Sequence, residues 1–350
     1  MPRIQLDALC PPCYNWRVAN VTSSQTTIRW IRSPHWAWVS LLLAVSAALG
    51  ACAGQEAAPS RAPNLPLAPA SLQAGQRLRA VATTSIVANL VRSVGGELIE
   101  LSTLLPLGAD PHAFEPTPRD VATLSSAQVV FANGAGLEEF LQRLLRNVGD
   151  KVSVVDCSQG VTLRTISGPE AQVTGGVDPH TWNTAANAIV FVGNIELALS
   201  ALDPAHAAEY RASAEAYTAQ LRELDTWIKA QIESIPVGQR RMVTDHESYG
   251  YYADRYGLGL VGAVIPNVST VAEPSAQQIA ALEDAIHKAG VRAIFVDTTV
   301  NPALARRVAA DTGIQLVRLY SGSLGSEGSG ADTYIGYMRY NTSAVVEALR

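Results

Sequence analysis

Three histidines stand where their side chains could bind a metal ion together. His112 and His180 each follow an Asp-Pro pair, and His246 comes just after a short apolar run. Because proline disfavours a helix at the first two positions, we expect both imidazoles to project from loops. Neutral imidazole binds zinc, copper, nickel and iron better than magnesium or calcium. Taken singly, each histidine suits a structural role, but the three together predict one shared site for a transition metal.

The other histidines have plainer roles. His206 and His287 fall in amphipathic stretches among Ala, Glu and Lys residues, where a solvated position is expected, and His35 lies in the leader described below. A metal-bound imidazole also needs an acceptor for its second ring nitrogen. The predicted acceptors are the nearby carboxylates of Asp110, Asp178 and Asp245.

The composition limits the function classes. The 350 residues, 48% of them hydrophobic, suffice for two globular domains. A net charge of -5, without a long basic run, argues against nucleic acid as a partner. Of the four cysteines, Cys10, Cys13 and Cys52 lie in or at the end of the leader, so we expect no disulfide framework in the mature body. Cys157 ends an apolar run and is expected in the core.

Residues 1–51 are predicted to be a removable secretory leader. Basic residues precede an uncharged stretch that runs to Ala51 and ends in small residues. The apolar run of about 15 residues is short of the roughly 20 needed to span a bilayer. Residues 1–28 are unusually polar for a leader, which suggests a mis-set translation start.

Residues 49–52, Leu-Gly-Ala-Cys, resemble the lipobox of bacterial lipoproteins. Cys52 would then carry a lipid and tether the protein to the membrane, and residues 52–77, rich in Ala, Pro, Ser and Gln, would form a flexible stalk. The alternative is a cysteine that happens to follow an ordinary cleavage site.

Short apolar runs alternate with amphipathic stretches over residues 78–202 and again over residues 237–350. The expected strands are 78–82, 99–104, 129–132 and 152–155, then 242–244, 259–264, 293–296 and 316–319. The expected helices are 86–94, 118–125, 137–148 and 185–202, then 249–255, 275–289, 302–312 and 333–349. This alternation predicts two doubly wound α/β lobes with parallel sheets. Ligands of such lobes bind beyond the carboxyl ends of the strands.

A single long helix is predicted between the lobes, over residues 203–236. Its apolar stripe consists of Tyr210, Tyr217, Leu221, Leu224, Ile228 and Ile232. About 30 residues at roughly 1.5 Å each would span some 45 Å, the length of both lobes. A continuous helix should restrict the lobes to small tilts.

Four segments carry a family resemblance: 110–120 (D-P-H-A-F-E-P-T-P-R-D), 178–183 (D-P-H-T-W-N), 245–258 and 334–341 (Y-I-G-Y-M-R-Y-N). From about residue 78 to 349 the chain resembles the metal-binding lipoproteins of ABC importers, which take up zinc or manganese and were once labelled adhesins. The resemblance implies two α/β lobes joined by a backbone helix, with the metal between them. It also implies a non-enzymatic, monomeric, lipid-anchored extracytoplasmic protein whose partners are an ABC permease and its ATPase subunit.

The resemblance also implies a ligand set. The first three family ligands fall on His112, His180 and His246. Members selective for manganese usually carry a carboxylate at the third position, so His246 favours Zn²⁺, with Mn²⁺ as the alternative. The fourth ligand of many relatives is an Asp that matches Gly322 here, which has no side chain to offer. Water could complete the site, or Asp297 could replace the missing ligand; Asp297 could equally be an acceptor for an imidazole, and Asp332 is a second candidate.

Other functions remain open from sequence. The His-rich loop of many zinc-binding members is missing between residues 163 and 177. Three histidines with an open position also suit a zinc hydrolase that ionises bound water. A siderophore or corrinoid binder with two rigid lobes and an adhesin are further alternatives. The Gly-rich run 321–331 lacks the Lys and Ser or Thr of a phosphate loop, so no nucleotide site is predicted there.

Overall fold

The computed structural model describes residues 67–73, 75–148, 152–166 and 176–350. The leader, Cys52 and most of the predicted stalk lie outside these residues. The described residues all belong to one compact unit, Arg61–Arg350. Within it they form two four-stranded parallel sheets.

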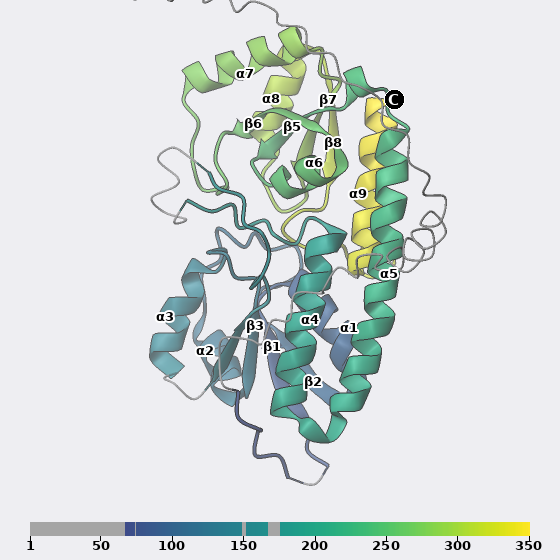
Figure 1. Cartoon of the computed structure of the whole chain (residues 1–350). Coiled ribbons are helices and arrows are strands. Elements are labelled where there is room, and N and C mark those ends of the chain that lie inside the picture. The colour runs from purple at the N-terminus through teal and green to yellow at the C-terminus, as the bar shows by residue number, and fades with distance from the viewer. Residues whose placement is uncertain (1–66, 74, 149–151, 167–175) are drawn as a thin grey trace, which may run out of the picture. The chain divides into compact units, whose positions relative to one another are not determined.

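The first lobe is a parallel sheet of strand order β2-β1-β3-β4 with helices on both faces (Figure 1). Its strands are β1 (Leu78–Ala82), β2 (Ile99–Thr103), β3 (Val129–Ala132) and β4 (Ser153–Asp156). Its helices are α1 (Ser85–Gly95), the 3-10 turn η1 (Gly96–Leu98), α2 (Pro118–Ser126), α3 (Glu139–Val148) and α4 (Ala185–Leu202). Along β3, Val129 and Phe131 join the core with α1 and α4, whereas Val130 and Ala132 join the core with α2 and α3. Strand residues therefore alternate between two buried faces, which explains the unbroken apolar runs.

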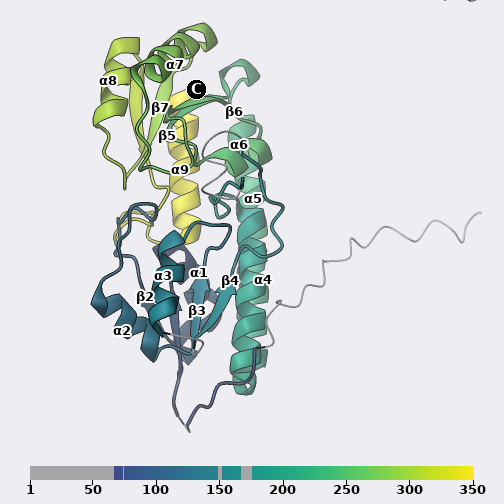
Figure 2. The same ribbon diagram turned by 90° about the vertical axis from the view of Figure 1, so that its left-hand side faces the viewer.

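The second lobe repeats this plan with strand order β6-β5-β7-β8. Its strands are β5 (Arg241–His246), β6 (Gly259–Ile265), β7 (Ala293–Asp297) and β8 (Gln315–Leu319). Its helices are the 3-10 turn η4 (Val237–Gln239), α6 (Gly250–Tyr256), α7 (Ala276–Ala289), α8 (Ala303–Thr312) and α9 (Tyr334–Leu349). In both lobes one pair of helices, α2 with α3 and α7 with α8, lies on the side of the sheet away from α5 (Figure 2).

Helix α5 (Ala207–Glu233) connects the lobes, after a 3-10 turn η3 (Pro204–His206). Its 27 residues span about 40 Å. It packs against α1 and α4 of the first lobe and against α6 and α9 of the second, and α9 lies beside it in Figure 1. The apolar stripe predicted for this helix is buried in one continuous core that contains residues of both sheets. The predicted fold is confirmed: two α/β lobes share one backbone helix.

Most boundaries differ from the prediction by one or two residues. The largest difference is in α5, which covers 207–233 rather than 203–236, because the 3-10 turn η3 comes before it. Helix α3 begins at Glu139 rather than residue 137, because the Glu138 carboxylate turns back to accept hydrogen bonds from the N–H groups of Asn133 and Gly134. Strand β5 extends to His246 and so includes a residue predicted to follow it. Helix α4 is long and apolar enough to cross a membrane, but half of it is buried and it packs on α1 and α5 as a core helix.

Candidate metal centre

The three predicted histidines meet at the carboxyl ends of the two sheets. His246 is the last residue of the interior strand β5, and His112 and His180 lie in the segments that follow the edge strands β2 and β4. One nitrogen from each ring lies within 4.8 Å of the others. The distance from His112 Nε2 to His180 Nε2 is 3.2 Å, close to the ~3.3 Å expected between two nitrogens on a tetrahedral zinc ion.

His180 is fully supported by a buried carboxylate. Asp178 Oδ1 accepts hydrogen bonds from His180 Nδ1 (2.9 Å) and from its main-chain N–H (3.0 Å), and this leaves Nε2 to face a metal. The other oxygen of Asp178 pairs with the Arg164 guanidinium at 2.8 Å. Burial acts to raise the pKa of Asp178, but the bonds from His180 and Arg164 outweigh it and lower the pKa. Burial lowers the pKa of His180, which favours the neutral ring that binds metal.

His246 is held in a similar way by its neighbour. Asp245 Oδ1 accepts hydrogen bonds from His246 Nδ1 (3.0 Å) and its main-chain N–H (2.8 Å). Asp245 Oδ2 accepts the N–H of Asp297 at the end of β7 (2.8 Å), so the carboxylate also joins two strand ends. Burial acts to lower the pKa of His246, and the Asp245 carboxylate reverses this, so the pKa ends raised.

His112 is different, because the predicted carboxylate contact to its ring is absent from the described structure. Asp110 Oδ1 accepts the main-chain N–H of His112 (2.9 Å), and Asp110 Oδ2 accepts the Thr270 hydroxyl (2.5 Å). Asp110 thus supports the main chain of His112 and not its ring, and its second oxygen bonds the other lobe. His112 is partly exposed, whereas His180 and His246 are buried. Burial and the two neighbouring imidazoles lower the pKa of His112.

Asp297 lies near this cluster but outside the group of converging nitrogens. Its Oδ1 accepts the N–H groups of Ser321 and Thr299 (both 3.1 Å), and its Oδ2 accepts the Gly322 N–H (2.9 Å) and the Thr299 hydroxyl (2.7 Å). Burial and the charge of Asp245 raise the pKa of Asp297. Asp332, the second candidate, accepts the Gly328 N–H and borders a different surface hollow.

Gly322 stands where the two lobes approach each other closely. A Cβ added at this position would lie 2.8 Å from Pro111 Cδ and 3.4 Å from Asp297 Oδ2. Any side chain here would therefore force Pro111, and with it the His112 segment, to move. The glycine at position 322 thus allows the close approach of the lobes and offers no side chain to a metal.

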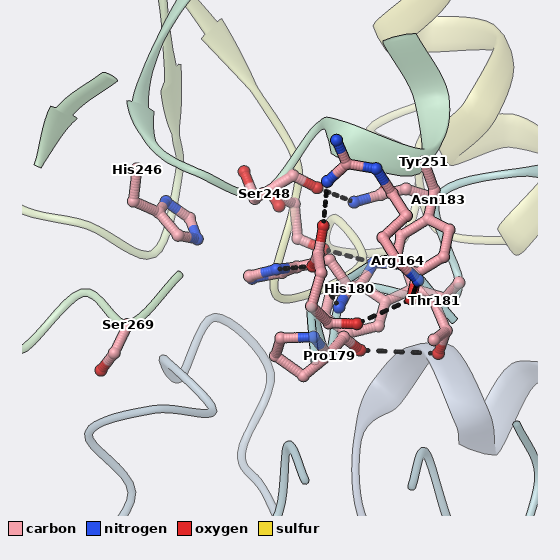
Figure 3. Close-up of polar contacts among 12 residues, drawn as sticks. Arg164, Pro179, His180, Thr181, Asn183, His246, Ser248, Tyr251 and Ser269 are labelled. Atoms are coloured by element: carbon pink, nitrogen blue, oxygen red, sulfur yellow. Dashed lines mark hydrogen bonds and ion pairs between the residues drawn. The ribbon is translucent and has the colours of Figure 1, made fainter. Parts of the chain in front are cut away.

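Several supporting residues were missed by the sequence reasoning. Asn183 Nδ2 donates to Ser248 O (2.8 Å), and Tyr337 donates to Asn183 Oδ1 (2.6 Å), so three motifs of the family resemblance contact one another. Their place in the 178–183 and 334–341 motifs was a usable signal. For Arg164 and Thr270 the sequence held no signal. Figure 3 shows the hydrogen bonds gathered around His180, with the His246 ring pointing toward them from the other side.

Comparisons with known proteins agree on one family. Residues 80–348 match the family model described as zinc-uptake complex component A, periplasmic. The manganese-binding lipoprotein MntA of Halalkalibacterium halodurans is 36% identical over 276 residues, which cover 79% of this chain and 89% of that protein. The manganese ABC transporter substrate-binding lipoprotein PsaA of Streptococcus mitis is 31% identical over 282 residues, covering 79% and 90%.

Solved structures show the same fold. The periplasmic zinc-binding protein TroA from Treponema pallidum superimposes with a TM-score of 0.73 at 26% identity, over 78% of this chain and 99% of that one. The Mn-bound periplasmic metal-binding protein from Candidatus Liberibacter asiaticus gives a TM-score of 0.70 at 23% identity, over 78% and 100%. MntA and TroA are named as metal-binding proteins and PsaA as the substrate-binding lipoprotein of an ABC transporter, and none of the three is named as an enzyme. With most of its length matched, the chain belongs to the family of the periplasmic component A of zinc-uptake complexes, the metal-binding solute-binding proteins of ABC importers.

Proposed function

We propose that this protein captures Zn²⁺ outside the cytoplasm with His112, His180 and His246 and delivers it to the permease of an ABC importer. The observation that carries the proposal is the convergence of three ring nitrogens within 4.8 Å. Carboxylates fix Nδ1 of His180 and of His246, so each Nε2 is presented to the same point. This is the outer-shell arrangement that orients zinc-bound histidines.

The donor set supports zinc over manganese. The converging atoms are three imidazole nitrogens, which suit zinc, whereas manganese favours carboxylate and water oxygens. The names of MntA and PsaA favour manganese for those proteins, so Mn²⁺ is the runner-up cargo. The zinc-binding name of TroA points the other way.

In this proposal the fourth position is filled by water and Asp297 is not a ligand. The Asp297 carboxylate already accepts five hydrogen bonds, three at Oδ1 and two at Oδ2, and three of the five donors are the main-chain N–H groups of Thr299, Ser321 and Gly322. To bind metal directly, Asp297 would have to give up part of this set. Its proposed role is to hold the Ser321–Gly322 turn against the site. The buried hydroxyls of Ser248 and Ser321 have no hydrogen-bond partner in the described part of the chain.

The proposal also covers delivery. Lipid attachment at Cys52 would keep the protein at the outer face of the membrane, next to the permease and its ATPase subunit. A monomer suffices, because all three histidines come from one chain.

Metal analysis of protein purified without chelator, followed by competition between Zn²⁺ and Mn²⁺, tests the function. We expect one equivalent of zinc and displacement of manganese by zinc. Each of His112→Ala, His180→Ala and His246→Ala should lose more affinity than the roughly 10- to 100-fold typical of an outer-shell change, and Asp297→Asn should stay within that range. Protein that binds neither metal would refute the proposal, and a loss in Asp297→Asn as large as in the histidine variants would make Asp297 a ligand.

A further inference from the structure

A segment of the second lobe, residues 267–272, lies over the exposed side of the metal centre. It follows β6 and forms one wall of a cavity of about 270 Å³. The opposite wall comes from the first lobe and includes His112, Phe114 and Phe140. Since His180 and His246 are buried, this cavity reaches the site at its one partly exposed histidine.

The segment is fixed at both of its ends to neighbours of the histidines. At the start, Asn267 O accepts the N–H of Glu247, the residue after His246 (2.9 Å). Near the end, the Thr270 hydroxyl donates to Asp110 Oδ2 (2.5 Å), and the other oxygen of Asp110 accepts the His112 N–H (2.9 Å). One carboxylate thus joins the His112 segment of the first lobe to the 267–272 segment of the second.

We propose that Thr270 is a positioning residue for His112, and that its bond to Asp110 is a clasp between the lobes that slows release of the bound metal through this cavity. The inference rests on the proposed function, because it assigns a role in holding the ion that the three histidines bind. Thr270 acts through Asp110 and touches no ligand itself. When the clasp opens, His112 is free to move with its loop, and the ion is left with two histidines.

The clasp is separable from the packing of the segment. Val268 is 1% exposed, whereas Thr270 is partly exposed and Val271 is 64% exposed. Removing the Thr270 hydroxyl should therefore leave the fold and the position of Val268 unchanged. A hydroxyl is required, but the methyl group of threonine is not, so serine should replace it.

The first test measures the rate at which the zinc-loaded protein releases zinc to excess chelator, by stopped flow. Thr270→Ala should release zinc about 3 to 10 times faster, as expected for the loss of one hydrogen bond that is formed in the closed state. Thr270→Ser should restore the wild-type rate. Ser269→Ala is the matched control, because the Ser269 hydroxyl contacts its own segment at the Val271 N–H (3.5 Å). The melting temperature of the metal-free protein should fall by no more than about 2 to 4 °C in Thr270→Ala and stay unchanged in the other two variants. Equal rates in wild type and Thr270→Ala, or equal acceleration in the three variants, would overturn the clasp.

The second test needs no metal, so it separates this inference from the proposed function. Spin labels on Arg119→Cys and Gln277→Cys, exposed positions on α2 and α7, report the distance between the lobes once Cys10, Cys13 and Cys52 are changed to serine. Thr270→Ala should broaden the distance distribution of the metal-free protein, and Thr270→Ser should not. Identical distributions would refute the clasp even if zinc binds as proposed. A protein that binds no metal but opens in Thr270→Ala would refute the function and keep the clasp.

Discussion

The two sides of the metal centre are supported very differently. On the His180 side, Asp178 is completely buried, bonds the ring of His180 and pairs with Arg164. Arg164 and Tyr251 then tie this side to the second lobe, since Tyr251 donates to Asp178 O at 2.8 Å and accepts the Arg164 N–H at 3.0 Å. On the His112 side, the carboxylate of Asp110 holds the main chain and takes one hydroxyl from the other lobe. The His180 side is therefore held by a buried network of charges, and the His112 side by two hydrogen bonds to Asp110.

Each side contains a glycine at which the two lobes approach each other closely, and the two glycines face different neighbours. A Cβ at Gly250 would overlap the Arg164 guanidinium and lie 2.7 Å from Asp178 Oδ2, so this glycine makes room for a buried ion pair. A Cβ at Gly322 would meet Pro111. The close approach at Gly250 accommodates a charged network, and the close approach at Gly322 brings the His112 segment near the opposite lobe.

The largest expected effect concerns Glu138, which supports the His180 side of the site through Asn133. Glu138 Oε1 accepts the N–H of Asn133 (2.6 Å), and Asn133 Nδ2 donates to Pro179 O, next to His180 (3.0 Å). Burial raises the pKa of Glu138 to about 7 from its usual 4.5. The folded state therefore binds this proton more tightly than the unfolded state. Its contribution to stability is complete below pH 4.5 and is lost as the pH rises through about 7, a change of about 3 kcal/mol.

Urea unfolding of the metal-free protein at pH 5 and pH 8 measures this effect. The free energy of unfolding of Glu138→Gln, relative to wild type, should rise by up to about 3 kcal/mol between the two pH values. The control is Glu139→Gln, an exposed neighbour that should follow wild type at both. A constant difference between Glu138→Gln and wild type would show that the buried carboxyl does not titrate in this range.

The next effect compares Asp110 and Asp178, the acidic residues of the two Asp-Pro-His segments. Asp178→Asn should weaken zinc binding about 10- to 100-fold, because the ring of His180 loses the charge that raises its basicity. Asp110→Asn should weaken zinc binding clearly less. In the described structure the Asp110 carboxylate bonds the main-chain N–H of His112 and not its ring. Equilibrium competition with a chromophoric chelator gives both values. Equal losses of zinc affinity in the two variants would mean that the carboxylate bond to the ring of His180 contributes no more than the carboxylate bond to the main chain of His112.

The smallest expected effect compares the two ion pairs of Arg164, the buried one with Asp178 and an exposed one. Arg164 also pairs with Asp254 of α6 at 2.7 Å, but the Asp254 side chain is 65% exposed. Solvent screens such a pair, so Asp254→Asn should lower the free energy of unfolding by less than about 1 kcal/mol and leave zinc affinity unchanged. Chemical denaturation and the same competition assay check this. A large loss would show that the outer pair, and not the buried one, holds Arg164 in place.

Much of this architecture could be predicted from sequence, because its signals are local or periodic. Strand β3 is an unbroken apolar run in the sequence because both of its faces are buried. The apolar residues of α5 recur at helical spacing because one core extends along the whole helix. The D-P-H segments identified His112 and His180 through the effect of proline on the chain. The cysteine in an apolar run, Cys157, is buried and free as predicted.

The parts that could not be predicted depend on contacts between distant segments. Arg164 reaches Asp178 from a loop 14 residues earlier, and Thr270 reaches Asp110 across 160 residues. Nothing near either residue marks it as a partner of a histidine. The role of Asp297 was also undecided, because its contacts with Ser321 and Gly322 arise only once β7 and β8 lie side by side.

The shared core around α5 has a consequence for how the molecule folds and can be divided. The apolar residues that bury α1 and α4 and those that bury α9 belong to one cluster, and α5 supplies its centre. Neither half of the chain could complete its own interior without this helix. We therefore regard residues 78–350 as a single cooperative folding unit rather than two autonomous domains, so that a cut within α5 would leave two fragments with exposed apolar faces.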